Sequence, residues 1–328
     1  MATKLLIDAI RDTMFEEMRA DERVIVMGED VGKRGGVFRV TAGLVDEFGE
    51  NRVIDTPLAE ASIVGVAIGA AFHGLRPIAE IQFFDFIHPA MDQILNEAAK
   101  IRYRSAGDFN CPIVIRTPYG GGVHGALYHS QSIEAIFTRE PGLKVVAPIM
   151  PSDAHGLLKT AIHDEDPVLF LEHKKGYRLV KDEVPDNDGA IPIGKARVVQ
   201  EGSDVTIITY GMMLLESLAA AKKAAEKDGT SVEVIDLRTL RPLDRDAILG
   251  SATKTGKVLI VHEANKIGGV GAEVAAMIAE EAFAYLDGPI MRVAGAEVPA
   301  MPYSPPLEHA YLPNQEKIGA ALDRLAAY

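Results

Sequence analysis

Cysteine is almost absent from this sequence of 328 residues, and its scarcity limits the kinds of site that the chain can build. Cys111 is the only cysteine, which excludes an intrachain disulfide and a metal cluster held by thiolates. Chains without disulfides are typical of a reducing compartment, so we expect a cytoplasmic protein.

Positive charge and long apolar runs are scarce as well. The formal net charge of −13 argues against nucleic acid or an anionic membrane as a partner. The longest apolar run, residues 63–71, is far too short to span a bilayer. The amphipathic segment 5–18 contains acidic residues and is typical of neither a signal peptide nor a transit peptide. With 48% hydrophobic residues, the composition indicates a globular protein with a large core.

Several familiar binding motifs are also missing. There is no G-x-x-x-x-G-K-[ST], so the glycine-rich segment 120–125 is not expected to bind a nucleoside triphosphate. Gly269 and Gly271 follow an apolar run but lack the third glycine and the acidic residue of a dinucleotide site. No zinc spacing and no G-x-S-x-G occur. The remaining candidates are carboxylates, aromatic side chains and histidines.

Apolar runs that read as strands alternate with segments that read as helices, one of them a long helix over residues 87–104. Such alternation predicts an α/β fold with a mainly parallel sheet and helices on both faces. The length suits two domains, which we place at residues 1–180 and 203–328. Between them, residues 181–202 are rich in charge, proline and Asp-Gly, which predicts a linker.

The first candidate site is the run DTPLAE at residues 55–60, which closes a predicted strand and opens a helix predicted over 59–75. Thr56 can cap that helix, and Pro57 suits its first position, where a missing N–H costs nothing. Glu60 then lies in the first turn, at the sheet edge where α/β folds place ligands. An acid there also gains about 0.3–1 kcal/mol from the helix dipole without any further role. The position alone therefore leaves a purely structural role open.

Small residues recur along the same helix at Ala61, Gly65 and Gly69, four positions apart and so on one face. Each glycine inside a helix costs about 1 kcal/mol relative to alanine. The spacing predicts close approach of another backbone, either a neighbouring element or a second subunit.

Aromatic residues and histidines follow two other predicted strands. Phe83, Phe84 and Phe86 come directly after Gln82, and His124 and His129 lie in and after the glycine-rich segment. Parallel strands gather ligands at their carboxyl ends, so each is a candidate. Core packing of the phenylalanines and structural hydrogen bonds of the histidines explain the same pattern.

Taken in order, several segments resemble one family. They are GEDVG at 28–32, DTPLAE at 55–60, EIQFFDF at 80–86, YGGGVHGALYHSQS at 119–132, PGLKVVAP at 141–148 and DLRTLRPLD at 236–244. Over essentially its whole length the chain resembles the β subunits of thiamine-diphosphate-dependent 2-oxo acid dehydrogenases. The stretch HGALYHSQS is more similar to the branched-chain (2-oxoisovalerate) enzymes than to the pyruvate enzymes.

The resemblance implies a transketolase-like pyrimidine-binding domain followed by a transketolase C-terminal domain. It implies that Glu60 hydrogen-bonds N1′ of the aminopyrimidine of thiamine diphosphate, which biases the electronics of the cofactor. Phe86 is implied to pack on the pyrimidine ring, with Gln82 and Leu58 beside the cofactor. Branched-chain relatives often carry tyrosine in place of Phe86, so a hydroxyl contact is lost here.

The histidine implied to act in reductive acylation of the lipoyl group is His129, with His124 as the alternative in the same loop. A histidine titrates near neutral pH, which suits delivery of a proton to a dithiolane sulfur.

The resemblance also bears on metals. It implies a possible K⁺ site, formed mainly by carbonyl oxygens, although a solvated helix end explains the same residues. The matching positions are Ile113, Ala161, Ile162, Asp164 and Asp166. The family expectation of a Gly-Asp-Gly run for Mg²⁺ is not met, because Phe109 follows Gly107 and Asp108. We therefore expect an α subunit to hold Mg²⁺ and to share thiamine diphosphate.

The implied assembly is an α₂β₂ heterotetramer that docks on a lipoyl acyltransferase core through its C-terminal domains. The implied reaction is oxidative decarboxylation of 2-oxoisovalerate-type acids with acyl transfer to lipoyllysine. A pyruvate or acetoin dehydrogenase β subunit is the nearest alternative. A non-catalytic assembly or binding module is the alternative from another class.

Overall fold

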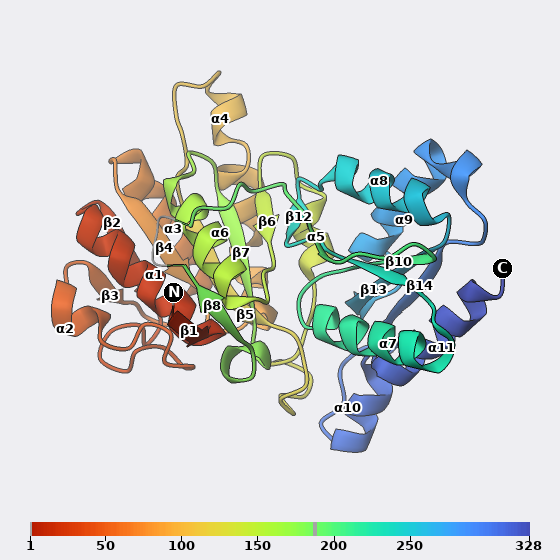
Figure 1. The fold of residues 1–328 in the computed structure, drawn as a ribbon. Helices are drawn as coiled ribbons and strands as arrows, with labels where there is room; N and C mark the ends of the chain where they lie inside the picture. Colours follow the sequence, from red (N-terminus) through yellow and green to blue (C-terminus); the bar gives the residue numbers. More distant parts are fainter. Residues whose placement is uncertain (1, 186–188) are drawn as a thin grey trace. The chain divides into compact units, whose positions relative to one another are not determined.

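A parallel sheet forms the centre of the N-terminal part of the chain (Figure 1). Its strands run in the order β6-β7-β5-β4-β2-β3, and all of these neighbours pair in parallel. Their bounds are β2 Val24–Gly28, β3 Val53–Asp55, β4 Arg76–Glu80, β5 Val114–Tyr119, β6 Lys144–Val146 and β7 Val168–His173. Every residue of β2, β5 and β7 is buried, as expected for strands covered on both faces. The predicted α/β class is confirmed.

The computed structural model describes residues 2–185 and 189–328, which form two compact units. The first contains the described residues up to Tyr119 and from Ile136 to Ile193. The second contains Gly120–Ala135 and Gly194–Tyr328. The glycine-rich segment therefore belongs to the second unit, although residues of the first unit flank it on both sides.

The helices of the first unit lie around its sheet (Figure 1), but one predicted helix is interrupted. They are α1 Leu6–Ala20, α2 Leu44–Phe48, α3 Glu60–Phe72, α4 Ile101–Arg104 and α6 Pro151–His163. The continuous helix predicted over residues 87–104 is wrong, because Pro89 lies in a 3₁₀ turn and a π-helical stretch, Asp92–Ala98, follows before α4. Proline has no N–H to donate to a preceding turn, which interrupts the regular ladder. Apolar residues one or two turns apart in this segment are nevertheless buried, namely Ile87, Ala90, Ile94 and Ala98.

Three strands of polar sequence were not predicted, namely β1 (Ala2–Leu5), β8 (Lys181–Val184) and β9 (Arg197–Gln200), and the last two lie in the expected linker. β1 pairs antiparallel with β8. β9 pairs antiparallel with β11 (Val232–Asp236). Residues 186–188 of the predicted linker lie outside the described residues. Exposed edge strands often carry charged residues, which protect them from pairing with other chains. Such strands lack the apolar runs by which strands are recognised in a sequence.

The second unit contains a five-stranded sheet in the order β14-β13-β10-β11-β9. Its parallel strands include β10 Val205–Thr209, β13 Val258–Asn265 and β14 Met291–Gly295. A further strand is β12 Thr239–Arg241. α5 Glu134–Thr138 follows the glycine-rich segment, and its residues from Ile136 onward belong to the first unit. The other helices are α7 Met213–Asp228, α8 Arg245–Thr255, α9 Val270–Glu281, α10 Pro305–Tyr311 and α11 Gln315–Ala326. Side-chain caps from Asp244 and Asn314 begin α8 and α11.

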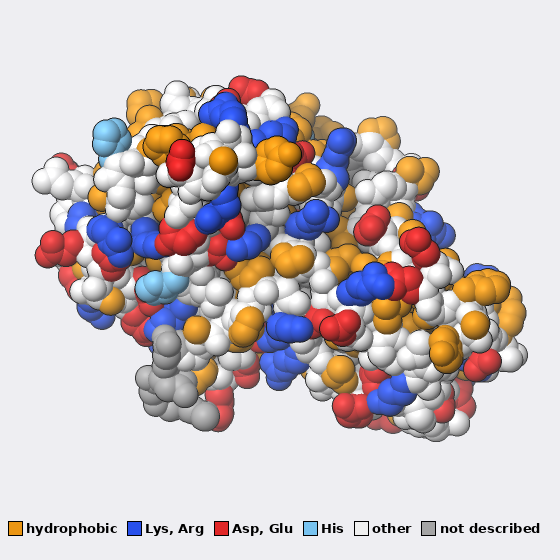
Figure 2. Space-filling view, turned by 90° about the horizontal axis from the view of Figure 1, so that it is seen from above, with side chains coloured by type: hydrophobic (Ala, Val, Ile, Leu, Met, Phe, Trp, Pro, Cys, Tyr) orange, Lys and Arg blue, Asp and Glu red, His pale blue; other side chains and the backbone are white. Residues whose placement is uncertain are grey.

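Acidic and basic side chains alternate over the face seen in Figure 2, with hydrophobic side chains between them. Among the described residues visible in that view the two charges are therefore mixed, although the chain as a whole is acidic. In the part of the chain that the structure describes, none of the helices has the length and apolarity needed to traverse a lipid bilayer.

Candidate active site

The run from Asp55 to Glu60 connects β3 to α3 and is held to the end of β2 and to the loop after it. The Thr56 backbone N–H donates to the Gly28 carbonyl at 2.9 Å, and the Gly32 N–H donates to Asp55 Oδ1 at 2.6 Å. The two sequence motifs at 28–32 and 55–60 therefore form one structural element at the carboxyl edge of β2 and β3.

The predicted cap of α3 is wrong. The helix begins at Glu60, its N-cap is Ala59, and no side chain caps it. Thr56 instead follows β3 directly, and its backbone N–H is bonded to β2. Three more residues separate it from the first residue of the helix. The Thr56 hydroxyl is buried without a hydrogen-bond partner among the described residues. A buried, unpaired donor of this kind fits a site that receives a polar ligand.

Glu60 lies close to a second acid, Glu29, which sequence reasoning did not single out. Burial raises the pKa of Glu29, and the charges of Asp30 and Glu60 raise it further. Gln82, which follows β4, donates from Nε2 to the Glu29 carbonyl oxygen at 3.3 Å. Glu29 comes directly after β2, so the strand-edge rule that selected Glu60 could have found it. The structure therefore gathers Glu29, Glu60 and Gln82 at one edge of the sheet.

The aromatic residues after β4 divide into two groups. Phe84 is fully buried and packs on Phe137 with ring centroids 5.5 Å apart, which is core packing. Phe86 is only half-buried, and its ring meets Phe83 edge to face at 5.6 Å. Leu58 is 70% exposed, which is unusual for a leucine between a strand and a helix. Phe86 and Leu58 therefore keep apolar surface available for a contact beyond the described residues of this chain.

A buried charge cluster lies across the strands that carry this edge. Arg116 on β5 donates from Nη1 to Glu80 Oε2 at 2.9 Å and from Nε to Glu172 Oε1 at 2.6 Å. Tyr177 donates from its hydroxyl to Glu172 Oε2 at 2.5 Å. Burial raises the pKa of Glu80, and the Arg116 guanidinium opposes that rise. The cluster joins β4, β5 and β7 just before the chain reaches Gln82.

The glycine-rich segment of the second unit holds the two candidate histidines in different surroundings. His124 has a left-handed backbone (φ +57°), and its Nδ1 lies 2.6 Å from Glu308 Oε2. His129 is half-buried, and its carbonyl oxygen would lie 2.5 Å from a Cβ added at Gly125. The His124 imidazole is thus engaged by a carboxylate, while His129 lies in a tight turn that only glycine at position 125 allows.

Comparison with known proteins identifies the family. Residues 4–180 match the transketolase pyrimidine-binding domain, and residues 194–318 match the transketolase C-terminal domain. The chain is 59% identical to the 2-oxoisovalerate dehydrogenase subunit beta of Bacillus subtilis (strain 168) over 328 residues, covering 100% of both chains. The chain belongs to the β subunits of the thiamine-diphosphate-dependent 2-oxo acid dehydrogenases.

Other relatives of this β subunit are slightly more distant. Pyruvate dehydrogenase E1 component subunit beta is 49% identical in Bacillus subtilis and 50% identical in Staphylococcus epidermidis, each covering 97% of both chains. A solved structure described as "Split gene transketolase, inactive beta4 tetramer" has a TM-score of 0.80 at 25% identity, covering 98% of both chains. The transketolase-like fold implied by the sequence resemblance is therefore confirmed.

The positions expected to hold K⁺ in this β subunit already have cationic neighbours. Arg76 donates from Nη1 to the carbonyl oxygens of Ile162 at 2.9 Å and Asp164 at 3.2 Å. Lys144 Nζ contacts both Asp164 carboxylate oxygens at 2.6 Å, and Arg102 Nε contacts Asp166 Oδ1 at 2.5 Å. The remaining positions, Ile113 and Ala161, lie before β5 and near the end of α6. A K⁺ site here stays a prediction.

Within residues 2–185 and 189–328, no three His, Cys, Asp or Glu side chains cluster as ligands of a metal ion.

The small-residue face of α3 is only partly covered by its own unit. A Cβ added at Gly65 would lie 3.4 Å from Gln93 Oε1, an ordinary contact with a side chain. A Cβ added at Gly69 would meet nothing within 4 Å. Ala61 is exposed, and Val66 on the same helix is 58% exposed. Close packing within the first unit therefore does not account for Gly69, and contact with a second subunit stays a prediction.

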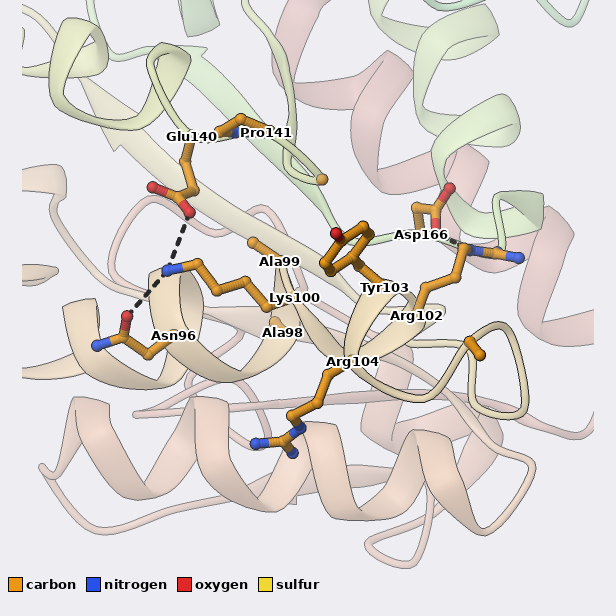
Figure 3. A pocket seen from close by; sticks show the side chains of 12 residues that line it. Asn96, Ala98, Ala99, Lys100, Arg102, Tyr103, Arg104, Glu140, Pro141 and Asp166 are labelled. Atoms are coloured by element: carbon orange, nitrogen blue, oxygen red, sulfur yellow. Dashed lines mark hydrogen bonds and ion pairs between the residues drawn. The ribbon is translucent and has the colours of Figure 1, made fainter.

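A pocket of about 1110 Å³ lies elsewhere in the first unit, along Asn96–Arg104 and the turn at residues 140–142 (Figure 3). Lys100 bridges Glu140 at 3.2 Å and Asn96 at 3.0 Å, and Tyr103 is 91% exposed. The pocket shares only Asp166 with the expected site residues.

Proposed function

We propose that this chain is the β subunit of a branched-chain 2-oxo acid dehydrogenase of the cytoplasm. The proposal rests on the sequence identity between this chain and its relatives. That identity is 59% to the β subunit of the 2-oxoisovalerate enzyme and 49–50% to those of the pyruvate enzymes. The substrate class would then be 2-oxoisovalerate-type acids, and the acyl acceptor would be lipoyllysine of an acyltransferase.

Glu60, Gln82, Phe86 and Leu58 would hold the aminopyrimidine part of thiamine diphosphate. When bound, the cofactor supplies a carbon nucleophile and an electron sink for decarboxylation. The half-buried Glu60 carboxylate would hold a proton shared with pyrimidine N1′, while Phe86 and Leu58 would pack on the ring and exclude water. Gln82 would be kept in place by its hydrogen bond to Glu29. The unpaired Thr56 hydroxyl gives the same edge a further polar group for a ligand.

His129 would donate a proton to a sulfur of the lipoyl group during reductive acylation. An imidazole suits this task because it can both accept and donate a proton. His124 is the less suitable donor, since its Nδ1 lies 2.6 Å from Glu308 Oε2.

A separate α subunit would complete the site. Phe109 stands where the family expectation requires the second glycine of Gly-Asp-Gly, so Mg²⁺ would be held by the α subunit together with the diphosphate. The assembly would be α₂β₂, and the C-terminal domain (residues 203–328) would dock on the acyltransferase core. Residues 1–180 would form the pyrimidine-binding domain.

The test is decarboxylation by the chain assembled with its α subunit, followed with an artificial electron acceptor. We expect a higher kcat/KM for 2-oxoisovalerate than for pyruvate, and a preference for pyruvate would favour the pyruvate dehydrogenase alternative. Glu60→Gln should lower turnover on the order of 10²-fold or more. The matched control is Glu226→Gln, at an exposed position of α7, which should leave turnover unchanged. Unchanged turnover in Glu60→Gln would favour a non-catalytic module.

A further inference from the structure

Two buried carboxylates of the second unit hold the backbone of the glycine-rich loop, residues 120–132. Glu263, near the end of β13, accepts a hydrogen bond from the Gly121 N–H at 2.6 Å and another from Ser132 Oγ at 3.1 Å. It therefore joins the beginning of the loop to its end. The Gly120 N–H also donates to the Gln131 carbonyl at 3.2 Å, which closes the loop on itself.

The second carboxylate belongs to Glu308 on α10. Its Oε1 accepts hydrogen bonds from the Gly122 N–H at 2.8 Å and the His124 N–H at 3.3 Å, and its Oε2 lies 2.6 Å from His124 Nδ1. Only 2% of Glu308 and 5% of Glu263 are exposed. A buried carboxylate is costly unless donors compensate it, and hydrogen bonds from N–H groups to a charged acceptor are strong.

The loop itself is shaped to fit these anchors. A Cβ added at Gly121 would lie 2.2 Å from Met301 Sδ, so a larger residue at this position would require the Met301 side chain to move. His124 and Ala126 both adopt left-handed backbone conformations (φ +57°), which non-glycine residues adopt only when their surroundings hold them there. The backbone of the loop that carries His129 is thus held by side chains at several points despite its glycine content.

We propose that Glu263 and Glu308 are positioning residues that present His129 for reductive acylation, and that His124 is part of this anchor rather than the proton donor. This inference rests on the proposed function. Neither glutamate belongs to the unit that carries Glu60, Gln82 and Phe86. Loss of an anchor should therefore affect acyl transfer to lipoyllysine more than decarboxylation.

The experiment compares two rates in the assembled α/β enzyme: decarboxylation with an artificial acceptor, and acylation of a free lipoyl domain. Glu308→Gln keeps the size of the side chain and removes its charge. We expect acylation to fall roughly tenfold or more, as for loss of a charged hydrogen bond, with a clearly smaller loss of decarboxylation. Amide hydrogen exchange over residues 121–132 should become faster, which loss of a proton donor alone would not cause.

Further variants separate anchoring from chemistry. His124→Gln should speed hydrogen exchange in the loop, whereas His129→Gln should lower acylation without changing the exchange of residues 121–124.

Equal loss of both rates in Glu308→Gln, or unchanged exchange, would overturn the proposal. If Glu308→Gln does not fold, Ser132→Ala, which removes one bond to Glu263, tests the same expectation. If the wild-type assembly does not decarboxylate any 2-oxo acid, the proposed function fails, while the exchange data still decide whether the carboxylates anchor the loop.

Discussion

The Tyr210 hydroxyl donates a hydrogen bond of 2.5 Å to Oε1 of the buried Glu134. Burial raises the pKa of Glu134 to about 7, although the hydrogen bond from Tyr210 opposes the rise. The ring of Tyr210 also stacks on His262 with centroids 6.2 Å apart, and burial lowers the pKa of His262 to about 4. One tyrosine thus contacts an acid and a base that burial shifts toward their neutral forms.

These two groups should give opposite pH dependences of stability. Folded Glu134 retains its proton up to about pH 7, whereas the unfolded side chain loses it near 4.5, so its contribution to stability falls as pH rises through this interval. The pKa of His262 is about 6.5 in the unfolded chain and about 4 in the folded protein. Between these values only the unfolded form binds a proton, so the contribution of His262 to stability rises with pH. In Glu134→Gln the melting temperature should rise relative to wild type between about pH 5 and pH 7. Parallel pH profiles for the two proteins would contradict this.

The Arg116 cluster should be among the most sensitive parts of the fold. Arg116→Met leaves Glu80 and Glu172 buried without their cation and should lower the free energy of unfolding by about 3–5 kcal/mol. Tyr177→Phe removes only one hydroxyl donor to Glu172 and should cost about 1–2 kcal/mol. Denaturant unfolding measures both changes. The control is Arg19→Gln, which breaks an exposed ion pair with Glu47 and should leave the midpoint unchanged; a comparable loss there would contradict the special role of burial.

Gly69→Ala separates stability from assembly. A Cβ added there meets nothing within 4 Å, so alanine should stabilise the chain purified alone by about 0.5–1 kcal/mol. If another subunit packs its backbone on this face, the same methyl group should weaken association with the α subunit, as measured by analytical ultracentrifugation. Gly250→Ala on α8 is the matched control, because its Cβ also meets nothing and it should stabilise without affecting association. Normal association of Gly69→Ala would argue against a close contact.

The K⁺ prediction is tested by comparing melting temperatures in KCl and NaCl at equal ionic strength. A bound ion stabilises the folded state by about 2.7 kcal/mol at a hundredfold excess over its Kd, so K⁺ should raise the melting temperature by several degrees if the site forms. Asp164→Asn should abolish that difference. Equal melting temperatures in both salts would indicate that Arg76 and Lys144 already satisfy these oxygens.

The sequence predicted those parts of the fold that have strong local patterns. Apolar runs were predicted to form strands, and the run Val24–Gly28 does form the fully buried strand β2. The helix predicted over residues 87–104 was wrong because the spacing of its apolar residues does not distinguish a continuous α-helix from a segment with a π-helical stretch. β1, β8 and β9 were missed because their exposed, polar sequences carry no alternation.

The candidate site was predictable only in part. Glu60, Gln82 and Phe86 each follow a strand, so the edge rule and the family resemblance both select them. The anchors of the glycine-rich loop could not be predicted, since Glu263 lies 142 residues from Gly121 and Glu308 lies 186 residues from Gly122. No local pattern encodes contacts across such separations.

Because the glycine-rich loop belongs to the second unit while its flanking residues belong to the first, a single cut near residue 190 does not yield two self-sufficient halves. An N-terminal fragment ending there would contain His124 and His129 but would lack the two carboxylates that accept hydrogen bonds from their loop. The complementary fragment would keep those acids, buried and deprived of the amides that compensate their charge. Expressing the halves separately should therefore yield two poorly folded polypeptides that recover their structure only when mixed.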